Sequence, residues 1–173
     1  MTHRIRTRPQ RRQDFAGADL VKRLLLVTDG TVTPMLEQIV GERLVTDRLT
    51  QTKTSADEEE ARRLGIPTGS AILVRSTDLA GRDSGRVFAH TKALVALDVL
   101  PARVRDGLLE TAEPIGRLLR ENRVETFRQT LPDQTCEYAD ADAARRQYVI
   151  YLNNSPGFLI EEHFLEACFV PRS

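Results

Sequence analysis

The chain is poor in the residues that most often hold metal ions or carry redox chemistry. It contains no tryptophan, two cysteines (Cys136 and Cys168) and three histidines (His3, His90 and His163) in 173 residues. The cysteines form no CxxC motif, and no histidine belongs to an HExxH or HxH motif, which are typical signatures of zinc sites. We therefore expect neither a metal nor another cofactor. The cysteines suit a reduced cytosolic protein, with a disulfide as the alternative.

The chain also lacks the glycine-rich motifs of nucleotide-binding and hydrolytic enzymes. There is no GxGxxG, no GxxxxGK[ST] and no GxSxG, so a dinucleotide site, a P-loop and a serine nucleophile have no support. The segment 27–31 resembles the DxDGT motif of phosphatases, but Val27 stands where its first aspartate would be. We interpret Asp29-Gly30 as a turn.

Net charge and long apolar runs are absent as well. Lysine plus arginine and aspartate plus glutamate both number 25, so nothing global favours nucleic acid or a membrane surface as a partner. No apolar run is long enough to span a membrane, and no signal peptide is recognisable. We expect a cytoplasmic monomer or homodimer that binds a small molecule. Residues 1–14 are expected to form a flexible basic arm and 15–173 a single domain.

The pattern of apolar residues predicts an α+β protein in which helices come first and a largely antiparallel sheet with a helical insertion follows. Thr33 and Pro34 are expected to begin the second helix, which Gly41 ends, and Ser55 with Glu58 to form a capping box for the third. Helices are predicted at 19–27, 34–40, 56–64, 101–109 and 115–120, and strands at 44–53, 71–79, 87–97, 124–129, 147–152 and 158–164.

One charged residue lies in the middle of an apolar strand. Side chains alternate across a strand, so Arg75 shares a face with Leu73 and Leu79. A buried charge without a partner is very costly, and we therefore expect an anionic group beside Arg75. Two interpretations stay open. Arg75 is either structural, in an ion pair or snorkelling at a sheet edge, or part of a site for a small anionic ligand.

Glu162 is the best partner for Arg75 that the chain offers. In the predicted last strand it shares an apolar face with Phe158, Ile160 and Phe164, whereas Glu161 falls on the opposite face. Two strands that each carry one charge on an apolar face would frame a small anionic ligand.

The helix that follows Pro114 offers further groups for an anion. The backbone N–H groups of Ile115 and Gly116 lie in its first turn, where they have no intrahelical acceptor, whereas Pro114 has no N–H. Arginine can also grip a carboxylate with two parallel hydrogen bonds. Anion binding is thus the chemistry that the residues support, although the proline can equally well do no more than begin a helix.

Six short motifs follow one another along the chain in a specific order. They are Thr31-Val32-Thr33 before a helix, Arg75 in its strand, Leu100-Pro101, Pro114-Ile115-Gly116-Arg117-Leu118-Leu119, Glu125-Thr126-Phe127-Arg128 and Glu162-His163-Phe164-Leu165. Together they resemble the chorismate pyruvate-lyase family, and most closely its branch from actinobacteria, archaea and cyanobacteria. The resemblance runs from about residue 20 to residue 169.

The resemblance implies a lyase that converts chorismate to 4-hydroxybenzoate and pyruvate without a metal or cofactor. It also implies the chorismate lyase-like fold, an antiparallel six-stranded sheet with helices packed on it. Arg75 would hold the ring carboxylate, which an amide at Ile115 would also contact, and Glu162 would bind the hydroxyl or move a proton. Val32 would line the pocket; the best-known branch has methionine there, which leaves the pocket shape and the exact substrate open.

Two points stay open beside this interpretation. The enolpyruvyl carboxylate of chorismate needs a second cation, and Lys92 and Arg128 are equal candidates. The alternative functions are a lyase for a chorismate analogue, such as the 4-amino compound, and a non-catalytic ligand-binding module of the same fold. We favour an enzyme over a sensing module, because the segment 1–19 is too short for the DNA-binding domain that accompanies this module in transcription regulators.

Overall fold

The computed structural model describes residues 11–131 and 144–169. Its helices are α1 (Arg11–Val27), α2 (Val32–Val40), α3 (Glu58–Leu64), α4 (Ala102–Glu110) and α5 (Ile115–Glu121), with short 3-10 turns η1 (Leu97–Val99) and η3 (Glu166–Cys168). Its strands are β1 (Leu44–Ser55), β2 (Ala71–Gly81), β3 (Val87–Ala96), β4 (Phe127–Thr130), β5 (Ala144–Leu152) and β6 (Ser155–Phe164).

All six strands form one antiparallel sheet in the order β1-β2-β3-β6-β5-β4. The predicted α+β class, the six-stranded antiparallel sheet and the hairpin of β2 and β3 are thereby confirmed. The order also separates the two strands on which the sequence placed its key charges. Arg75 and Glu162 lie on the same face of the sheet. They are not on neighbouring strands, because β3 lies between β2 and β6.

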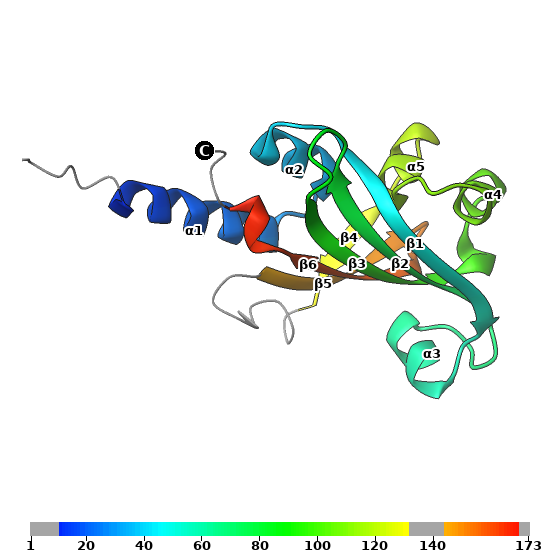
Figure 1. The fold of residues 1–173 in the computed structure, drawn as a ribbon. Helices are drawn as coiled ribbons and strands as arrows, with labels where there is room; N and C mark the ends of the chain where they lie inside the picture. Colours follow the sequence, from blue (N-terminus) through cyan, green and yellow to red (C-terminus); the bar gives the residue numbers. More distant parts are fainter. Residues whose placement is uncertain (1–10, 132–143, 170–173) are drawn as a thin grey trace, which may run out of the picture.

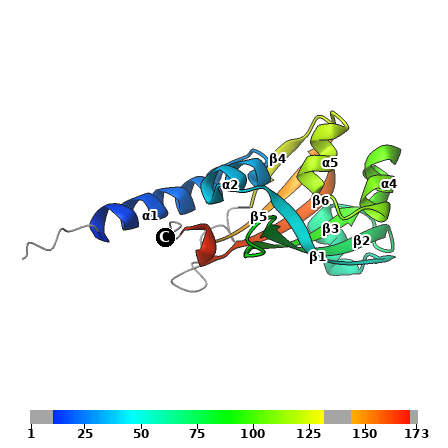
Figure 2. The ribbon, with the colours of Figure 1, turned by 45° about the horizontal axis from the view of Figure 1, so that its top comes forward.

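The helices divide unequally between the two faces of the sheet (Figures 1 and 2). Helices α2, α4 and α5 lie over one face, α3 lies on the other, and α1 extends beyond the sheet. Two apolar clusters fill the helix-rich face: one under α4 and α5, centred on Val95, Leu108 and Phe158, and one under α1 and α2, centred on Leu36 and Phe164. A third, smaller cluster packs α3 against the opposite face.

Two helix starts differ from the prediction. Helix α2 begins at Val32 with Thr31 in the N-cap position, not at Pro34 after Thr33. The predicted capping box of Ser55 and Glu58 is wrong, since Asp57 and Glu60 form it. Ser55 still pairs with β2, so cross-strand hydrogen bonds extend β1 past the point at which local capping signals would end it.

Other boundaries differ in ways that matter for the site. Strand β5 begins at Ala144 rather than at 147, because the ladder with β6 continues through Arg145 and Arg146.

Helix α1 begins at Arg11, inside the segment expected to be a flexible arm. Residues 1–10 of that arm and Cys136 lie outside the described residues. The predicted loop 153–157 is a tight turn in which Asn153 and Asn154 have φ of 48° and 64°, as a two-residue hairpin requires.

Within the described ranges, no helix combines the length and the apolar character needed to cross a lipid bilayer.

Candidate active site

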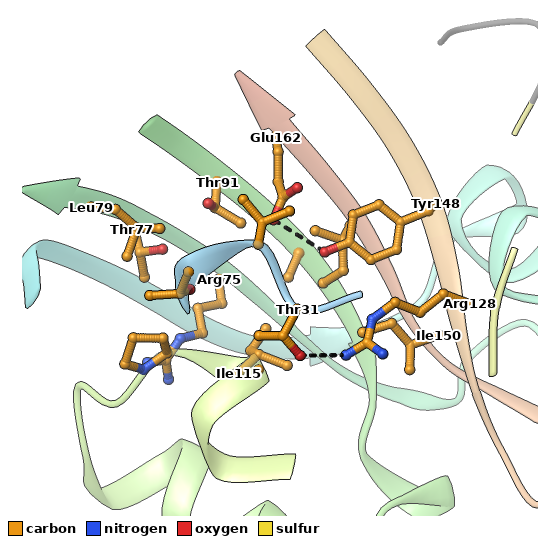
Figure 3. A pocket seen from close by; sticks show the side chains of 16 residues that line it. Thr31, Arg75, Thr77, Leu79, Thr91, Ile115, Arg128, Tyr148, Ile150 and Glu162 are labelled. Carbon is orange, nitrogen blue, oxygen red and sulfur yellow. Dashed lines mark hydrogen bonds between the residues drawn. The ribbon is translucent and has the colours of Figure 1, made fainter. Parts of the chain in front are cut away.

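A cavity opens on the helix-rich face of the sheet, where the N-terminal ends of α2 and α5 meet. Five of the six strands contribute to its floor, and only β1 does not. Its volume is about 50 Å³, and most of its wall is apolar. Figure 3 shows Arg75, Arg128 and Glu162 reaching it from three different strands. The cavity thus gathers charged side chains that are far apart in the sequence.

Arg75 is buried beside the cavity with a relative exposure of 2%. It donates from Nη1 to the carbonyl oxygen of Leu108 at 2.9 Å and to Gln51 Oε1 at 3.0 Å, and from Nη2 to the carbonyl oxygen of Glu113 at 2.9 Å. The two carbonyls lie at the end of α4 and in the loop after it, and Gln51 lies in β1. All three acceptors are neutral dipoles, so they orient the guanidinium without neutralising it. Burial lowers the pKa of Arg75.

Glu162, the best candidate partner of Arg75 in the sequence, does not pair with it, so this choice of partner and the interpretation of a structural Arg75–Glu162 ion pair are wrong. The reason lies in the strand order, since two inter-strand spacings of about 4.8 Å separate β2 from β6. No carboxylate of the described residues pairs with Arg75, and its Nε has no hydrogen-bond partner among them. The cavity thus contains a buried cation that still needs an anion.

Arg128 is the second cation at the cavity. It extends from the edge strand β4 and donates from Nη2 to Thr31 Oγ1 and from Nη1 to Thr126 Oγ1, both at 3.3 Å. Both partners are neutral hydroxyls, and no carboxylate of the described residues pairs with Arg128. Of the two candidate cations, only Arg128 lines this cavity.

Lys92 lies on the other face of the sheet. It is exposed in β3 and faces Glu161 and His163, because the neighbours Thr91 and Ala93 point into the cavity instead. Strand alternation thus removes Lys92 from the site. The same alternation confirms the predicted register of β6, since Glu162 is buried on the cavity face and Glu161 lies on the opposite one.

Glu161 belongs to a separate, partly exposed ion-pair group. Its Oε1 accepts from His163 Nε2 at 2.9 Å and pairs with Arg145 Nη2 at 3.0 Å. Burial alone would raise the pKa of Glu161, but the hydrogen bonds from His163 and Arg145 outweigh burial and lower it. Glu161 therefore serves as a control for Glu162 in the experiments below.

Two residues that the sequence reasoning missed bind Glu162. Arg146 donates from Nε to Glu162 Oε2 at 2.6 Å, and Tyr148 donates its hydroxyl to Oε1 at 3.1 Å. Both lie on β5, on the same face as Ile150. The predicted strand 147–152 contains Tyr148 but begins after Arg146. Extending it backwards by period-two alternation places Arg146 on the same face as Tyr148.

The wall opposite the sheet comes from the first turns of two helices. Val32 of α2 and Ile115 and Gly116 of α5 line the cavity, as do Thr31 and Pro114. The N–H groups of Ile115 and Gly116 lie in the first turn of α5 and have no intrahelical acceptor. The two helix ends touch at Gly116, where a Cβ atom would lie 2.5 Å from Thr31 Cγ2.

No group of three or more histidine, cysteine, aspartate or glutamate side chains with the geometry of a metal site occurs in the described part of the chain. Cys168 is buried and its Sγ donates to the carbonyl oxygen of Phe88, and burial raises the pKa of this thiol to about 12. A protonated, buried thiol is a poor nucleophile. The ionisable side chains that line the cavity are those of Arg75, Arg128, Tyr148 and Glu162, among the residues that the structure describes.

Solved structures share this fold at low sequence identity. PhnF from Mycobacterium smegmatis matches with a TM-score of 0.56 and 19% identity over 80% of this chain and 65% of that one. The effector domain of PhnF from the same organism matches with a TM-score of 0.53 and 18% identity over 79% of this chain and 88% of that one. The architecture is the α+β chorismate lyase-like fold.

Sequence comparison then gives the family. Residues 26–166 match the family described as "Chorismate pyruvate-lyase Rv2949c-like", and the chain belongs to it. Similar curated proteins are the chorismate pyruvate-lyases of Mycobacterium leprae, 28% identical over 91% of this chain and 80% of that one, and of Mycobacterium tuberculosis, 26% identical over 85% and 80%. The chain is accordingly a lyase, and the predicted family is confirmed.

The contact between the two helix ends generates a prediction. Gly116→Ala should force α2 and α5 apart at the cavity wall, because overpacking by one methyl group typically costs about 1–3 kcal/mol. We expect the affinity for a ligand of the cavity, measured by calorimetry, to fall by about tenfold or more. The free energy of unfolding, measured with urea, should fall only modestly. Thr31→Ser removes the opposing methyl but keeps the hydroxyl beside Arg128, so the double variant should recover affinity. A double variant as weak as Gly116→Ala would contradict this packing argument.

Proposed function

We propose that the protein converts chorismate to 4-hydroxybenzoate and pyruvate. The observation that supports this most directly is the pair of arginines, Arg75 and Arg128, that face one cavity without a carboxylate partner among the described residues. Leaving two cations unpaired in a largely apolar site is costly unless a ligand supplies the anions. Chorismate carries two carboxylates, one on the ring and one on the enolpyruvyl group.

The roles of the residues follow from their positions. Arg75, fixed by the carbonyls of Leu108 and Glu113, would hold the ring carboxylate, with the N–H groups of Ile115 and Gly116 beside it. Arg128 would hold the enolpyruvyl carboxylate. A cavity of about 50 Å³ holds only a few water molecules, so a ring-sized ligand must displace the wall formed by the ends of α2 and α5.

The proposed reaction needs little from the protein besides orientation. The ring carbon that bears the hydroxyl loses its hydrogen as a proton, and the bond from the neighbouring ring carbon to the ether oxygen breaks. The electron pair leaves with the enolpyruvyl group, which takes up a proton at its methylene carbon and becomes pyruvate, while the ring becomes aromatic. Glu162 and Tyr148 would fix the hydroxyl, and Glu162 would move the proton; in support of these roles, both side chains line the cavity.

The deciding experiment is incubation of the purified protein with chorismate. We expect pyruvate, measured with lactate dehydrogenase, and 4-hydroxybenzoate, measured by chromatography, in equal amounts and well above the spontaneous breakdown of chorismate. Tight binding of chorismate without release of pyruvate would overturn the proposal in favour of a ligand-binding module. Turnover of the 4-amino analogue alone would point to a lyase of another pathway.

Arg75→Lys should abolish most of the activity, although it keeps the charge. Lysine is a point charge and cannot form the two parallel hydrogen bonds of a guanidinium, and losing one partner of a charge pair in a dry site costs about 2–5 kcal/mol. The rate at low chorismate concentration should therefore fall by at least about 30-fold. Arg145→Lys, on the opposite face, is the matched control and should keep the rate. Equal rates for both variants would show that Arg75 is only structural.

Glu162→Gln and Glu161→Gln form a second matched pair. Glu162→Gln removes the negative charge and the basic oxygen that would take the proton, and should reduce kcat by on the order of 100-fold. It also breaks a buried ion pair, so its thermal unfolding must be measured and the assay run where the variant is folded. Glu161→Gln should keep kcat near that of the wild type. A larger kcat loss in Glu161→Gln would place the catalytic carboxylate on the other face.

A further inference from the structure

Arg146, the buried arginine behind Glu162, is held in place from two sides. It is 1% exposed, it does not line the cavity, and it donates from Nε to Glu162 Oε2 at 2.6 Å. Its Nη1 donates to the carbonyl oxygens of Leu25 at 2.9 Å and Thr28 at 2.7 Å, where α1 ends. Because backbone groups fix the guanidinium, its charge stays directly behind Glu162.

Both oxygens of Glu162 already accept a hydrogen bond from a protein group. Tyr148 donates to Oε1, and its ring lies under the Arg146 guanidinium at 4.6 Å. Burial and the neighbouring Glu162 raise the pKa of Tyr148, so the phenol keeps its proton and remains a donor to the carboxylate. What this end of the cavity offers a ligand is therefore the remaining lone pairs of Glu162 and of the Tyr148 oxygen.

The charges around this end of the cavity favour a neutral donor. The Arg146–Glu162 pair sums to zero, and the other charged groups that line the cavity, Arg75 and Arg128, are both positive. A hydroxyl can donate to Glu162 at no electrostatic cost. An ammonium group would be desolvated near three guanidinium groups, while Glu162, the one carboxylate that lines the cavity among the described residues, is already paired.

We propose that Arg146 is a specificity-determining residue: by neutralising Glu162 it restricts the site to ring dicarboxylates that carry a hydroxyl, and not an ammonium group, at the carbon facing Glu162. The inference rests on the proposed function, because it takes the orientation of the ring from the roles of Arg75 and Arg128. Arg146 acts through Glu162 and does not touch the substrate.

Turnover of chorismate and of its 4-amino analogue tests the proposal with one assay, because both would release pyruvate. The aliphatic amine of the analogue is protonated at neutral pH. We expect the wild type to prefer chorismate by about 100-fold in kcat/KM, as the cost of an unmatched charge in a dry site implies. Arg146→Gln should reduce that preference by about tenfold or more, while Arg146→Lys, which keeps the charge, should retain it at a lower rate.

Arg145→Gln is the matched control for this series. Arg145 immediately precedes Arg146 on β5, points to the opposite face and pairs with Glu161, so its loss should leave the preference unchanged. A merely structural role of Arg146 would lower both kcat/KM values together. An Arg146→Gln variant that turns over chorismate with the wild-type preference would therefore overturn the proposal.

Binding of two nearly isosteric probes separates this inference from the proposed function. Calorimetry with 4-(hydroxymethyl)benzoate and the cationic 4-(aminomethyl)benzoate needs no turnover. The wild type should bind the hydroxyl probe at least about tenfold more tightly than the cationic probe, and Arg146→Gln should reduce this difference in affinity. If Arg146→Gln does not fold, Glu162→Gln serves instead. It leaves the charge of Arg146 unneutralised, so the difference in affinity between the two probes should increase by about tenfold.

An unchanged difference in affinity overturns the inference about Arg146. Absence of pyruvate from either substrate overturns the proposed function alone.

Discussion

The arrangement of the site depends on a cation that has been buried without being neutralised. Arg75 is held by the carbonyl groups at the end of α4 and in the loop that follows, which supply oriented partial charges but no full negative charge. Such a group is stable enough to keep its place and still favours an anion strongly. The helices α4 and α5 therefore have two functions: they cover the apolar end of the sheet, and they orient the guanidinium that a carboxylate would bind.

The order of the strands converts this local feature into a site with two ends. Because β3 separates β2 from β6, Arg75 and Glu162 share a face at a distance that neither side chain bridges, and the space between them is the cavity. Were β2 and β6 neighbours, the two charges would meet and form an internal ion pair. Glu162 instead pairs with Arg146 of the adjacent β5. The edge strand β4 then brings Arg128 to the same cavity, so that positive charge exceeds negative charge there.

The two faces of the sheet show how strictly alternation sorts these functions. Neighbouring residues divide between them at three places: Glu162 from Glu161, Arg146 from Arg145, and Thr91 from Lys92. Of the outer members, Glu161 and Arg145 form a partly exposed ion pair, which is worth little in water, and Lys92 is exposed to solvent. The inner Glu162 and Arg146 are buried, where each charge has a large effect. The sheet thus keeps a cluster of charges on its outer face without disturbing the cavity.

Local patterns in the sequence determined much of this protein. Alternation placed Arg75 and Glu162 on buried apolar faces and Glu161 on the opposite one, because side-chain direction in a strand is a local property. Pro114 marked the start of α5, because its missing N–H is equally local. The order and spacing of short motifs also determined the family. These features do not depend on which strands lie next to each other.

Tertiary structure decided which of these charges meet. The partner of Glu162, the absence of a carboxylate beside Arg75 and the choice of Arg128 over Lys92 all follow from the strand order and register, which long-range pairing sets. The early start of β5 at Ala144 has the same origin, since the ladder with β6 outweighs the weak strand preference of two arginines. The pairing of β3 with β6 joins segments far apart in the chain and leaves no local signal, and the register of the β5–β6 hairpin then brings Arg146 and Tyr148 to Glu162.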